Sequence, residues 1–163
     1  MKIETTRFGT IKVDDGSIIE MPEGMLGLER IKRFVLLEDD PGSAYKWLQA
    51  VDEPSVAFIV VNPLDFFPDY DVELTDEQAE TLGLEDASDA VMFTTVTLDR
   101  GAKTLTTNLL GPVVINARTL RAGQIVLDDG RDRYATKHVI CGCGEDCSNG
   151  GKKAAAVAAG QGA

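Results

Sequence analysis

Residues 45–63 read YKWLQAVDEPSVAFIVVNP, and this stretch decides the fold class. Apolar and polar residues in and around it mostly alternate with a period of two, which is typical of half-buried β-strands. Residues 55–61 are apolar almost throughout, as in a strand that is covered on both faces. The polar Asp52-Glu53-Pro54 separates the two runs. We therefore expect two neighbouring strands at the centre of a sheet, with Trp47 and Phe58 largely buried.

The chain on both sides of this stretch has a similar composition. Val, Ile and Thr are frequent in short runs that Gly and Pro divide, as expected for strands. Asp15-Gly16 favours a tight hairpin turn, so the first three runs are expected to form a meander. The further predicted strands are residues 2–8, 10–14, 17–21, 33–38, 89–99, 103–111, 112–119 and 122–130.

One helix is predicted, from Thr75 to Leu82. Thr75 and Gln78 have the spacing of a capping box, and Gly83 is placed to end the helix. With so many short strands and one helix, the sequence predicts a mostly β fold. We expect a compact antiparallel β-barrel or sandwich-like domain with one short helix.

Composition and charge exclude several classes of protein. The 163 residues include 16 Lys and Arg against 27 Asp and Glu, a formal net charge of −11. Such a field repels phosphate backbones, so direct nucleic-acid binding is not expected. The amino terminus does not have the pattern of a signal peptide, and no run of 18 apolar residues occurs that could span a membrane. With three cysteines, which cannot all pair within one chain, we expect a cytoplasmic protein.

The carboxyl terminus differs in composition, so we divide the chain into a β domain of residues 1–140 and a flexible tail of residues 141–163. Gly and Ala dominate this tail. His138, Cys141, Cys143 and Cys147 are ligand types for zinc, although their spacing is not that of paired zinc knuckles. A zinc-binding protein or small metal-dependent enzyme that uses this cluster is therefore the alternative reading. Because neither a shaped nucleophile site nor a P-loop is visible, we expect a non-enzymatic protein without a cofactor.

Charge is segregated along the chain, since no basic residue occurs between Lys46 and Arg100. The stretch between Lys46 and Arg100, which we call the acidic sector, contains the proline-bounded segment NPLDFFPDYDVEL, residues 62–74. Aromatic anchors with a charged rim are typical of protein interfaces. An alternation of side chains would direct one phenylalanine ring outward, while the alternative packs both rings inward to close a barrel end. The predicted partner-binding residues are Phe66, Phe67, Asp69, Tyr70, Asp71 and Glu73.

Three blocks of the sequence resemble a known family in their order and spacing. They are residues 8–37 (FGTIKVDDGSIIEMPEGMLGLERIKRFVLL), 47–74 (WLQAVDEPSVAFIVVNPLDFFPDYDVEL) and 107–127 (TNLLGPVVINARTLRAGQIVL). The chain resembles the flagellar assembly factor family FliW over about residues 2–135. Residues 136–138 read Thr-Lys-His where the family tends to carry an arginine-histidine element, and the Cys-, Gly- and Ala-rich tail is not a feature of the family.

The resemblance implies a function that composition does not supply. Proteins of this family are non-enzymatic cytoplasmic binders of flagellin. They also bind CsrA, a small basic RNA-binding regulator, and relieve its repression of flagellin translation. Abundant flagellin occupies the assembly factor and frees the regulator, whereas export of flagellin releases the factor to bind the regulator again. An acidic domain suits a basic protein partner of this kind.

Overall fold

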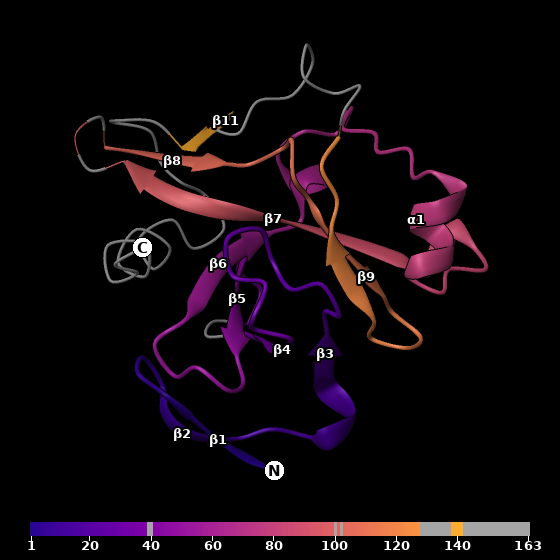
Figure 1. Cartoon of the computed structure of the whole chain (residues 1–163). Helices are drawn as coiled ribbons and strands as arrows, with labels where there is room; N and C mark the ends of the chain where they lie inside the picture. The colour runs from indigo at the N-terminus through magenta and orange to yellow at the C-terminus, as the bar shows by residue number, and fades with distance from the viewer. Residues whose placement is uncertain (39–40, 100, 102, 128–137, 142–163) are drawn as a thin grey trace.

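The computed structural model describes residues 1–38, 41–99, 101, 103–127 and 138–141. Two strands, β1 (Lys2–Thr5) and β2 (Gly9–Lys12), form a separate antiparallel hairpin. The other nine strands form one sheet, in which seven follow the order β10-β9-β7-β6-β5-β4-β3, β8 pairs with β7, and β11 pairs with β8 (Figure 1). Their bounds are β3 Ile18–Glu20, β4 Arg33–Leu37, β5 Tyr45–Ala50, β6 Ala57–Val61, β7 Ala90–Asp99, β8 Thr104–Thr107, β9 Val113–Asn116, β10 Ala122–Gln124 and β11 His138–Cys141.

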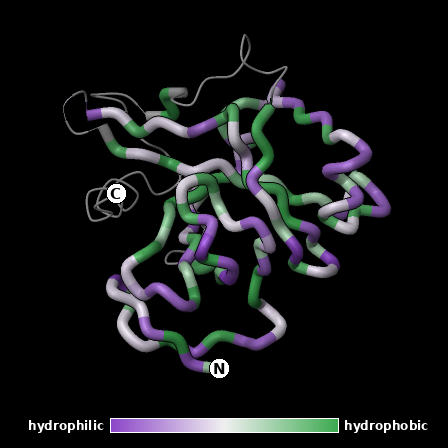
Figure 2. The backbone as a smooth tube through the Cα atoms, viewed as in Figure 1, coloured by the Kyte–Doolittle hydropathy of each residue, from purple (hydrophilic) through white to green (hydrophobic). Residues whose placement is uncertain are grey.

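The predicted central pair of strands is confirmed. β5 and β6 are antiparallel neighbours in which Trp47 is opposite Ile59 and Leu48 is opposite Phe58. Side chains alternate between two apolar clusters on opposite faces of the sheet. Tyr45, Trp47, Ile59 and Val61 belong to one cluster, and Leu48, Ala50 and Val60 belong to the other. β6 is therefore covered on both faces, which is why its sequence is apolar almost throughout (Figure 2).

Trp47 is buried as predicted, with 2 % of its surface exposed. Its ring and that of Phe8 are nearly perpendicular, with 5.7 Å between their centroids, and the guanidinium carbon of Arg7 lies 4.5 Å from the centroid of Trp47. These contacts join the β1–β2 hairpin to the main sheet. Phe58 is only half-buried, so the expectation that its ring is largely buried is met in part.

β7 runs across the molecule and is the longest strand (Figure 1). Three strands, β6, β8 and β9, pair with it. Its first part pairs with β9, with Phe93 opposite Val113, and its last part pairs with β8, with Leu98 opposite Leu105. Residues 94–96 pair with β6. The strand thus connects the half of the sheet that carries β9 and β10 to the half that carries β8 and β11.

The sheet stays open and sandwich-like, so the barrel alternative is wrong. Its edge strands β3 and β10 meet only at one isolated parallel bridge between Glu20 and Arg121. The N–H of Glu20 donates to the carbonyl oxygen of Leu120 at 2.9 Å. A single bridge leaves most of both edges without a continuous ladder, and closure into a barrel requires one.

The predicted meander at Asp15-Gly16 is also wrong. Residues Asp15–Ser17 form a 3₁₀ turn, η1, and the side chain of Asp14 accepts a hydrogen bond from the N–H of Gly16 at 3.2 Å. This turn sends the chain from the small hairpin into the main sheet, so β2 and β3 are not neighbours. The short side chain of Asp14 stabilises the turn locally, and tertiary packing selects it over a hairpin.

The predicted helix is confirmed as α1, Asp76–Thr81. The hydroxyl of Thr75 accepts from the N–H of Gln78 at 3.1 Å, and the Gln78 side chain accepts from the N–H of Thr75 at 2.9 Å. Gly83 follows with a φ of +67°, a conformation that favours glycine. Two further 3₁₀ turns are η2, Pro63–Asp65, and η3, Ala87–Asp89.

Residues 21–32 have no regular helix or strand in the structure, although an isolated bridge pairs Met25 with Leu28. Gly24 has a φ of +67°, and a Cβ there would lie 2.6 Å from the Cα of Glu29. Glycine is therefore required at this position for two separate reasons. The irregular segment contributes Met21, Met25 and Ile31 to the main core.

Candidate partner-binding surface

The aromatic loop, which we define as residues 62–73, follows β6 and leads to α1. The side chain of Asn62 caps η2 by accepting from the N–H of Leu64 at 3.0 Å. The N–H groups of Phe66 and Phe67 both donate to the carbonyl oxygen of Pro63, at 3.2 and 2.8 Å. The N–H of Tyr70 donates to the carbonyl oxygen of Phe67 at 2.9 Å. These consecutive turns stabilise the loop by hydrogen bonds within the chain.

The two phenylalanine rings of the loop pack on different apolar clusters. Phe66 is half-buried and lies against Tyr45, with 6.0 Å between ring centroids. Phe67 is also half-buried and packs on a separate cluster that contains Tyr70, Leu109 and Leu127. The rings therefore diverge as expected, but neither points fully outward. The period-two argument fails because this backbone is a series of turns, and alternation applies only to strands.

Tyr70, one of the predicted partner-binding residues, has a buried ring and anchors the loop. Only 5 % of the residue is exposed. Its hydroxyl donates a hydrogen bond of 2.6 Å to the backbone carbonyl oxygen of Leu109, in the segment that joins β8 to β9. A buried phenol needs such a partner, since an unpaired hydroxyl in the core is costly. Tyr70 thus holds the loop to the sheet.

The outer face of the loop combines apolar and acidic groups. Leu64 is 43 % exposed, and Pro68 is exposed beside the half-buried rings. The exposed carboxylates of the loop are those of Asp65, Asp69, Asp71 and Glu73. The described residues show no salt bridge to Asp65, Asp69 or Glu73. The arrangement is an apolar patch with an acidic rim.

Ion pairs outside the aromatic loop lie toward both ends of the acidic sector. At one end, Asp52 pairs with Arg33 from β4, with a distance of 3.0 Å from Nε to Oδ2. The hydrogen bond from Arg33 holds the pKa of Asp52 below its ordinary value. At the other end, Nη1 of Arg118 lies 3.2 Å from Oε2 of Glu85 and 3.6 Å from Oδ2 of Asp89. The aromatic loop and α1 lie between these pairs in the sequence.

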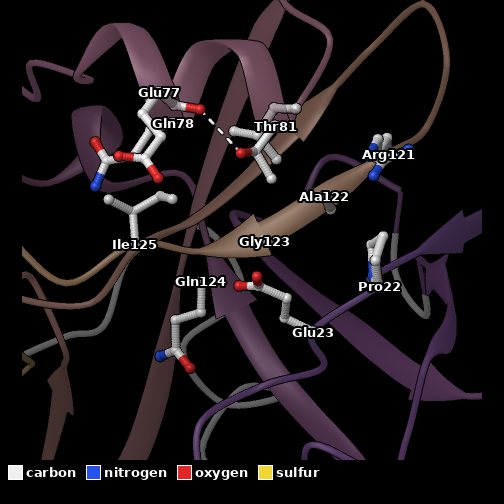
Figure 3. A pocket seen from close by; sticks show the side chains of 11 residues that line it. Pro22, Glu23, Glu77, Gln78, Thr81, Arg121, Ala122, Gly123, Gln124 and Ile125 are labelled. Carbon is white, nitrogen blue, oxygen red and sulfur yellow. Dashed lines mark hydrogen bonds between the residues drawn. The ribbon is translucent and has the colours of Figure 1, made fainter.

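A groove runs between α1 and β10, and we call it the α1–β10 groove (Figure 3). Its volume is about 190 Å³, and it is walled on one side by the helix and on the other by Pro22 and Glu23. A more open hollow, lined by Glu77, Glu80, Thr81, Gly83 and Arg121, adjoins it. The residues that line the groove are Pro22, Glu23, Glu77, Gln78, Thr81, Leu82, Arg121, Ala122, Gly123, Gln124 and Ile125.

Sequence reasoning did not find this groove. Glu23 and Gln124 are about a hundred positions apart in the chain, and only the fold brings their segments together. One local signal exists: Glu77 and Glu80 are three residues apart on α1, a spacing that places both on one side of a helix.

The cysteine cluster lies mostly outside the described residues. His138 and Cys141 are the first and last residues of β11, which pairs with β8, whereas Cys143 and Cys147 belong to the part not described. Among the described residues, no three His, Cys, Asp or Glu side chains gather as a metal-ligand set. The strand extends one residue past the predicted boundary at 140, and the division into a domain and a tail stays a prediction.

Within the described part of the chain, α1 and the shorter turns are the helical segments, and none has the length and apolar character needed to cross a bilayer.

Comparisons with known proteins agree with this architecture. The family model described as FliW protein matches residues 2–140. A flagellar assembly factor FliW of Magnetococcus marinus is 43% identical over 130 residues, which cover 79% of this chain and 80% of the relative. One from Geobacter sulfurreducens is 42% identical over 138 residues, 85% of each chain.

A solved structure shows the same fold. The crystal structure of the flagellar assembly factor FliW superposes with a TM-score of 0.79 at 28% sequence identity, covering 89% of this chain and 100% of that one. Residues 2–140, which the family model matches, contain both the aromatic loop and the α1–β10 groove. By family model, sequence identity and fold alike, this chain belongs to the FliW family of flagellar assembly factors.

Proposed function

We propose that this chain acts without catalysis, in the cytoplasm, as a binding protein for flagellin and for a CsrA-type translational regulator. The two partners exchange on it. When flagellin is abundant, it occupies the assembly factor and leaves the regulator to repress flagellin translation. When flagellin has been exported, the factor binds the regulator and synthesis resumes. Membership of the family supports this proposal, and the surface of the aromatic loop supplies its physical basis.

The observation that carries the proposal is the preorganised, acid-rimmed aromatic loop. Its conformation is held by the η2 turn and by the hydrogen bond from Tyr70 to Leu109, so a partner does not have to order it. The contact residues that we propose are Phe66, Phe67, Asp69, Asp71 and Glu73, together with the exposed Leu64. We assign Tyr70 the role of holding these residues in place.

Electrostatics supports a basic protein as one of the partners. The chain carries a net charge of −11, and the rim of the loop lacks salt bridges at Asp65, Asp69 and Glu73 among the described residues. Such a rim accelerates encounter with a positively charged protein and disfavours direct contact with RNA. The apolar centre of the loop would supply the contacts that slow dissociation.

The zinc alternative receives no support from the family match or from the described residues, and we do not propose it. The tail of residues 141–163 lies beyond the family match, which ends at residue 140, and we assign it no part in the function proposed here.

A competition experiment tests the proposal. Fluorescently labelled regulator is titrated with this chain, and purified flagellin is then added. We expect binding of the regulator and its release by flagellin. Absence of binding to either protein would contradict the proposal, and so would a complex of all three in which flagellin leaves the affinity for the regulator unchanged.

Matched variants locate the surface. Leu64→Ser alters an exposed side chain of the loop, whereas Val139→Ser alters a side chain of similar exposure, 55 %, on β11. We expect the first substitution to raise the dissociation rate from at least one partner and the second to leave both partners unaffected. Equal effects of the two substitutions would show that the loop is not the contact surface.

A further inference from the structure

The strand β10 lines the α1–β10 groove, and one of its two edges is paired with β9. The N–H of Asn116 donates to the carbonyl oxygen of Arg121 at 2.8 Å, and the N–H of Ile125 donates to that of Pro112 at 2.9 Å. In an antiparallel ladder, alternate residues bond to the same neighbour, so residues 121, 123 and 125 are directed toward β9. The backbone N–H and C=O groups of Gln124, and the C=O of Ala122, are therefore directed to the outer edge.

This outer edge is left for another strand to pair with. β3 reaches β10 only at the isolated bridge between Glu20 and Arg121, and no strand of the described residues forms a ladder there. Beyond the bridge, Pro22 and Glu23 form one wall of the groove (Figure 3). An edge with unpaired N–H and C=O groups is a template for strand addition.

The walls of the groove are held firmly. Asn116 is 1 % exposed, and its Nδ2 donates to the carbonyl oxygens of Leu82 and Gly83 at 3.0 and 3.1 Å, fixing the end of α1. Gly123 lies under this end, since a Cβ there would be 3.5 Å from Cδ2 of Leu82. The C-terminal end of α1 is therefore held beside β10 (Figure 3).

An exposed apolar side chain stands beside the groove. Leu26 is 63 % exposed, the largest exposure among the large apolar residues of the described chain. Its N–H donates to Oε1 of Gln124 at 3.0 Å, and Nε2 of Gln124 donates to the carbonyl oxygen of Gly111 at 3.0 Å. The β10 strand thus holds the loop that displays Leu26.

The charges around the edge determine which segment fits. Three carboxylates, those of Glu23, Glu77 and Glu80, line the groove and the adjoining hollow, against one guanidinium, that of Arg121. The described residues show no salt bridge to any of the four. A segment with Lys or Arg at alternate positions would place its charges near these carboxylates while its backbone pairs with Gln124.

We propose that the outer edge of β10 is a docking site for an extended, basic segment of a partner protein, which adds as a further strand to the sheet. Its backbone bonds to Ala122 and Gln124, its cationic side chains lie near Glu23 and Glu77, and an apolar side chain contacts Leu26. The inference rests on the proposed function only in that the chain works by binding proteins. This site is distinct from the aromatic loop.

The test uses a labelled peptide of sequence KVKAKVK, the full chain, fluorescence anisotropy and amide chemical-shift mapping. We expect shifts at residues 121–125 and at Leu26. N-methylation of alternate peptide nitrogens removes donors along one edge and should weaken binding about tenfold. A peptide with glutamate in place of lysine should not bind measurably.

Two substitutions at Gln124 separate the backbone from the side chain. Gln124→Pro removes an N–H that is directed away from β9 and is tolerated at a strand edge, so it should weaken binding about tenfold. Gln124→Ala keeps that N–H and should have a smaller effect. The doubly substituted Glu23→Gln, Glu77→Gln chain should bind roughly two- to tenfold more weakly, and Glu4→Gln on β1 should not differ from the parent.

Several results would overturn the proposal. If the methylated and unmethylated peptides bound the parent chain with equal affinity, strand addition would be excluded, even if the substituted chains did not fold. Amide chemical-shift changes confined to residues 62–73 would exclude it as well. If the Lys152→Gln, Lys153→Gln chain bound the peptide more tightly than the parent chain does, the basic tail of the chain would be the segment that occupies the edge. If the parent chain formed a dimer and Gln124→Pro dissociated it, a second copy of the chain would be the occupant of the edge. Because neither flagellin nor the regulator is used, failure here is independent of the proposed function.

Discussion

The hydroxyl of Tyr70 donates a 2.6 Å hydrogen bond to the backbone carbonyl oxygen of Leu109, and both residues are buried. This bond connects the aromatic loop to the segment between β8 and β9, 39 positions further along the chain. The loop that we propose as a contact surface is therefore part of the folded core on its inner side. Its outer side, with Leu64 and the carboxylates, is left for a partner.

Tyr70→Phe should lower the free energy of unfolding by about 1–2 kcal/mol, because the Leu109 carbonyl group loses its partner in a buried site. Urea denaturation measures the change. Tyr45→Phe is the control, because the buried Tyr45 hydroxyl has no hydrogen-bond partner among the described residues, and it should cost much less. If the two substitutions had equal effects, the hydrogen bond would not anchor the loop.

Asn116→Ala should destabilise the protein by about 2–4 kcal/mol. Its buried side chain donates to the carbonyl oxygens of Leu82 and Gly83 and accepts from the N–H of Arg118 at 3.0 Å. Thr75→Ala, which removes the N-cap of the same helix, should cost about 1 kcal/mol. Equilibrium unfolding compares the two. A larger loss from Thr75→Ala would mean that α1 depends more on its cap than on the sheet.

Phe34→Ala should cost about 3–5 kcal/mol, because this ring is fully buried in the main core. Phe58→Ala should cost less, about 1–3 kcal/mol, because its ring is half-buried at the edge of the same cluster. Thermal or urea unfolding of both variants checks this order. The reverse order would contradict the packing of β4 and β6 described here.

The ion pair of Arg33 with Asp52 should make a small, pH-dependent contribution to stability. The hydrogen bond from Arg33 lowers the pKa of Asp52 in the folded state, so the unfolded state binds the proton more readily. The contribution is therefore present above the ordinary pKa of an aspartate and is lost as the pH falls through the lower, folded-state pKa. Both side chains are about half exposed, so it stays below about 1 kcal/mol.

Asp52→Asn tests this contribution. Its unfolding free energy at pH 7 should fall slightly below that of the parent chain, and the gap should close as the pH is lowered through the folded-state pKa of Asp52. Denaturant unfolding at several pH values measures the gap. A gap that widened in acid would show that the carboxylate of Asp52 is destabilised by its surroundings.

Asp69→Lys should slow association with the proposed CsrA-type regulator roughly two- to fivefold at low salt, because it reverses one charge of the rim. Glu4→Lys makes the same change in net charge on the distant β1–β2 hairpin and should have little effect. Stopped-flow kinetics at several salt concentrations resolve the two rates. Equal slowing by both would mean that overall charge, and not the loop, steers encounter.

The amino-acid sequence by itself determined most of the local structure. Ten of the strand segments and the helix follow from apolar periodicity and from turn and cap residues, which act over a few positions. The capping box of Thr75 and Gln78 and the glycine at Gly83 are local in this sense, and each was found where predicted. β11 was missed because its residues lie next to the Gly-rich segment, and its pairing with β8 supplies the bonds that make it a strand.

The tertiary structure decided where the elements meet. Whether Tyr70 is displayed or buried depends on Leu109, and whether β3 closes on β10 depends on a single bridge between Glu20 and Arg121. The α1–β10 groove joins Glu23 to Gln124 through the same long-range packing. Periodicity specifies which face of a strand is apolar, but it does not specify which other strand covers that face. Those pairings follow from the balance of burial and hydrogen bonding over the whole chain.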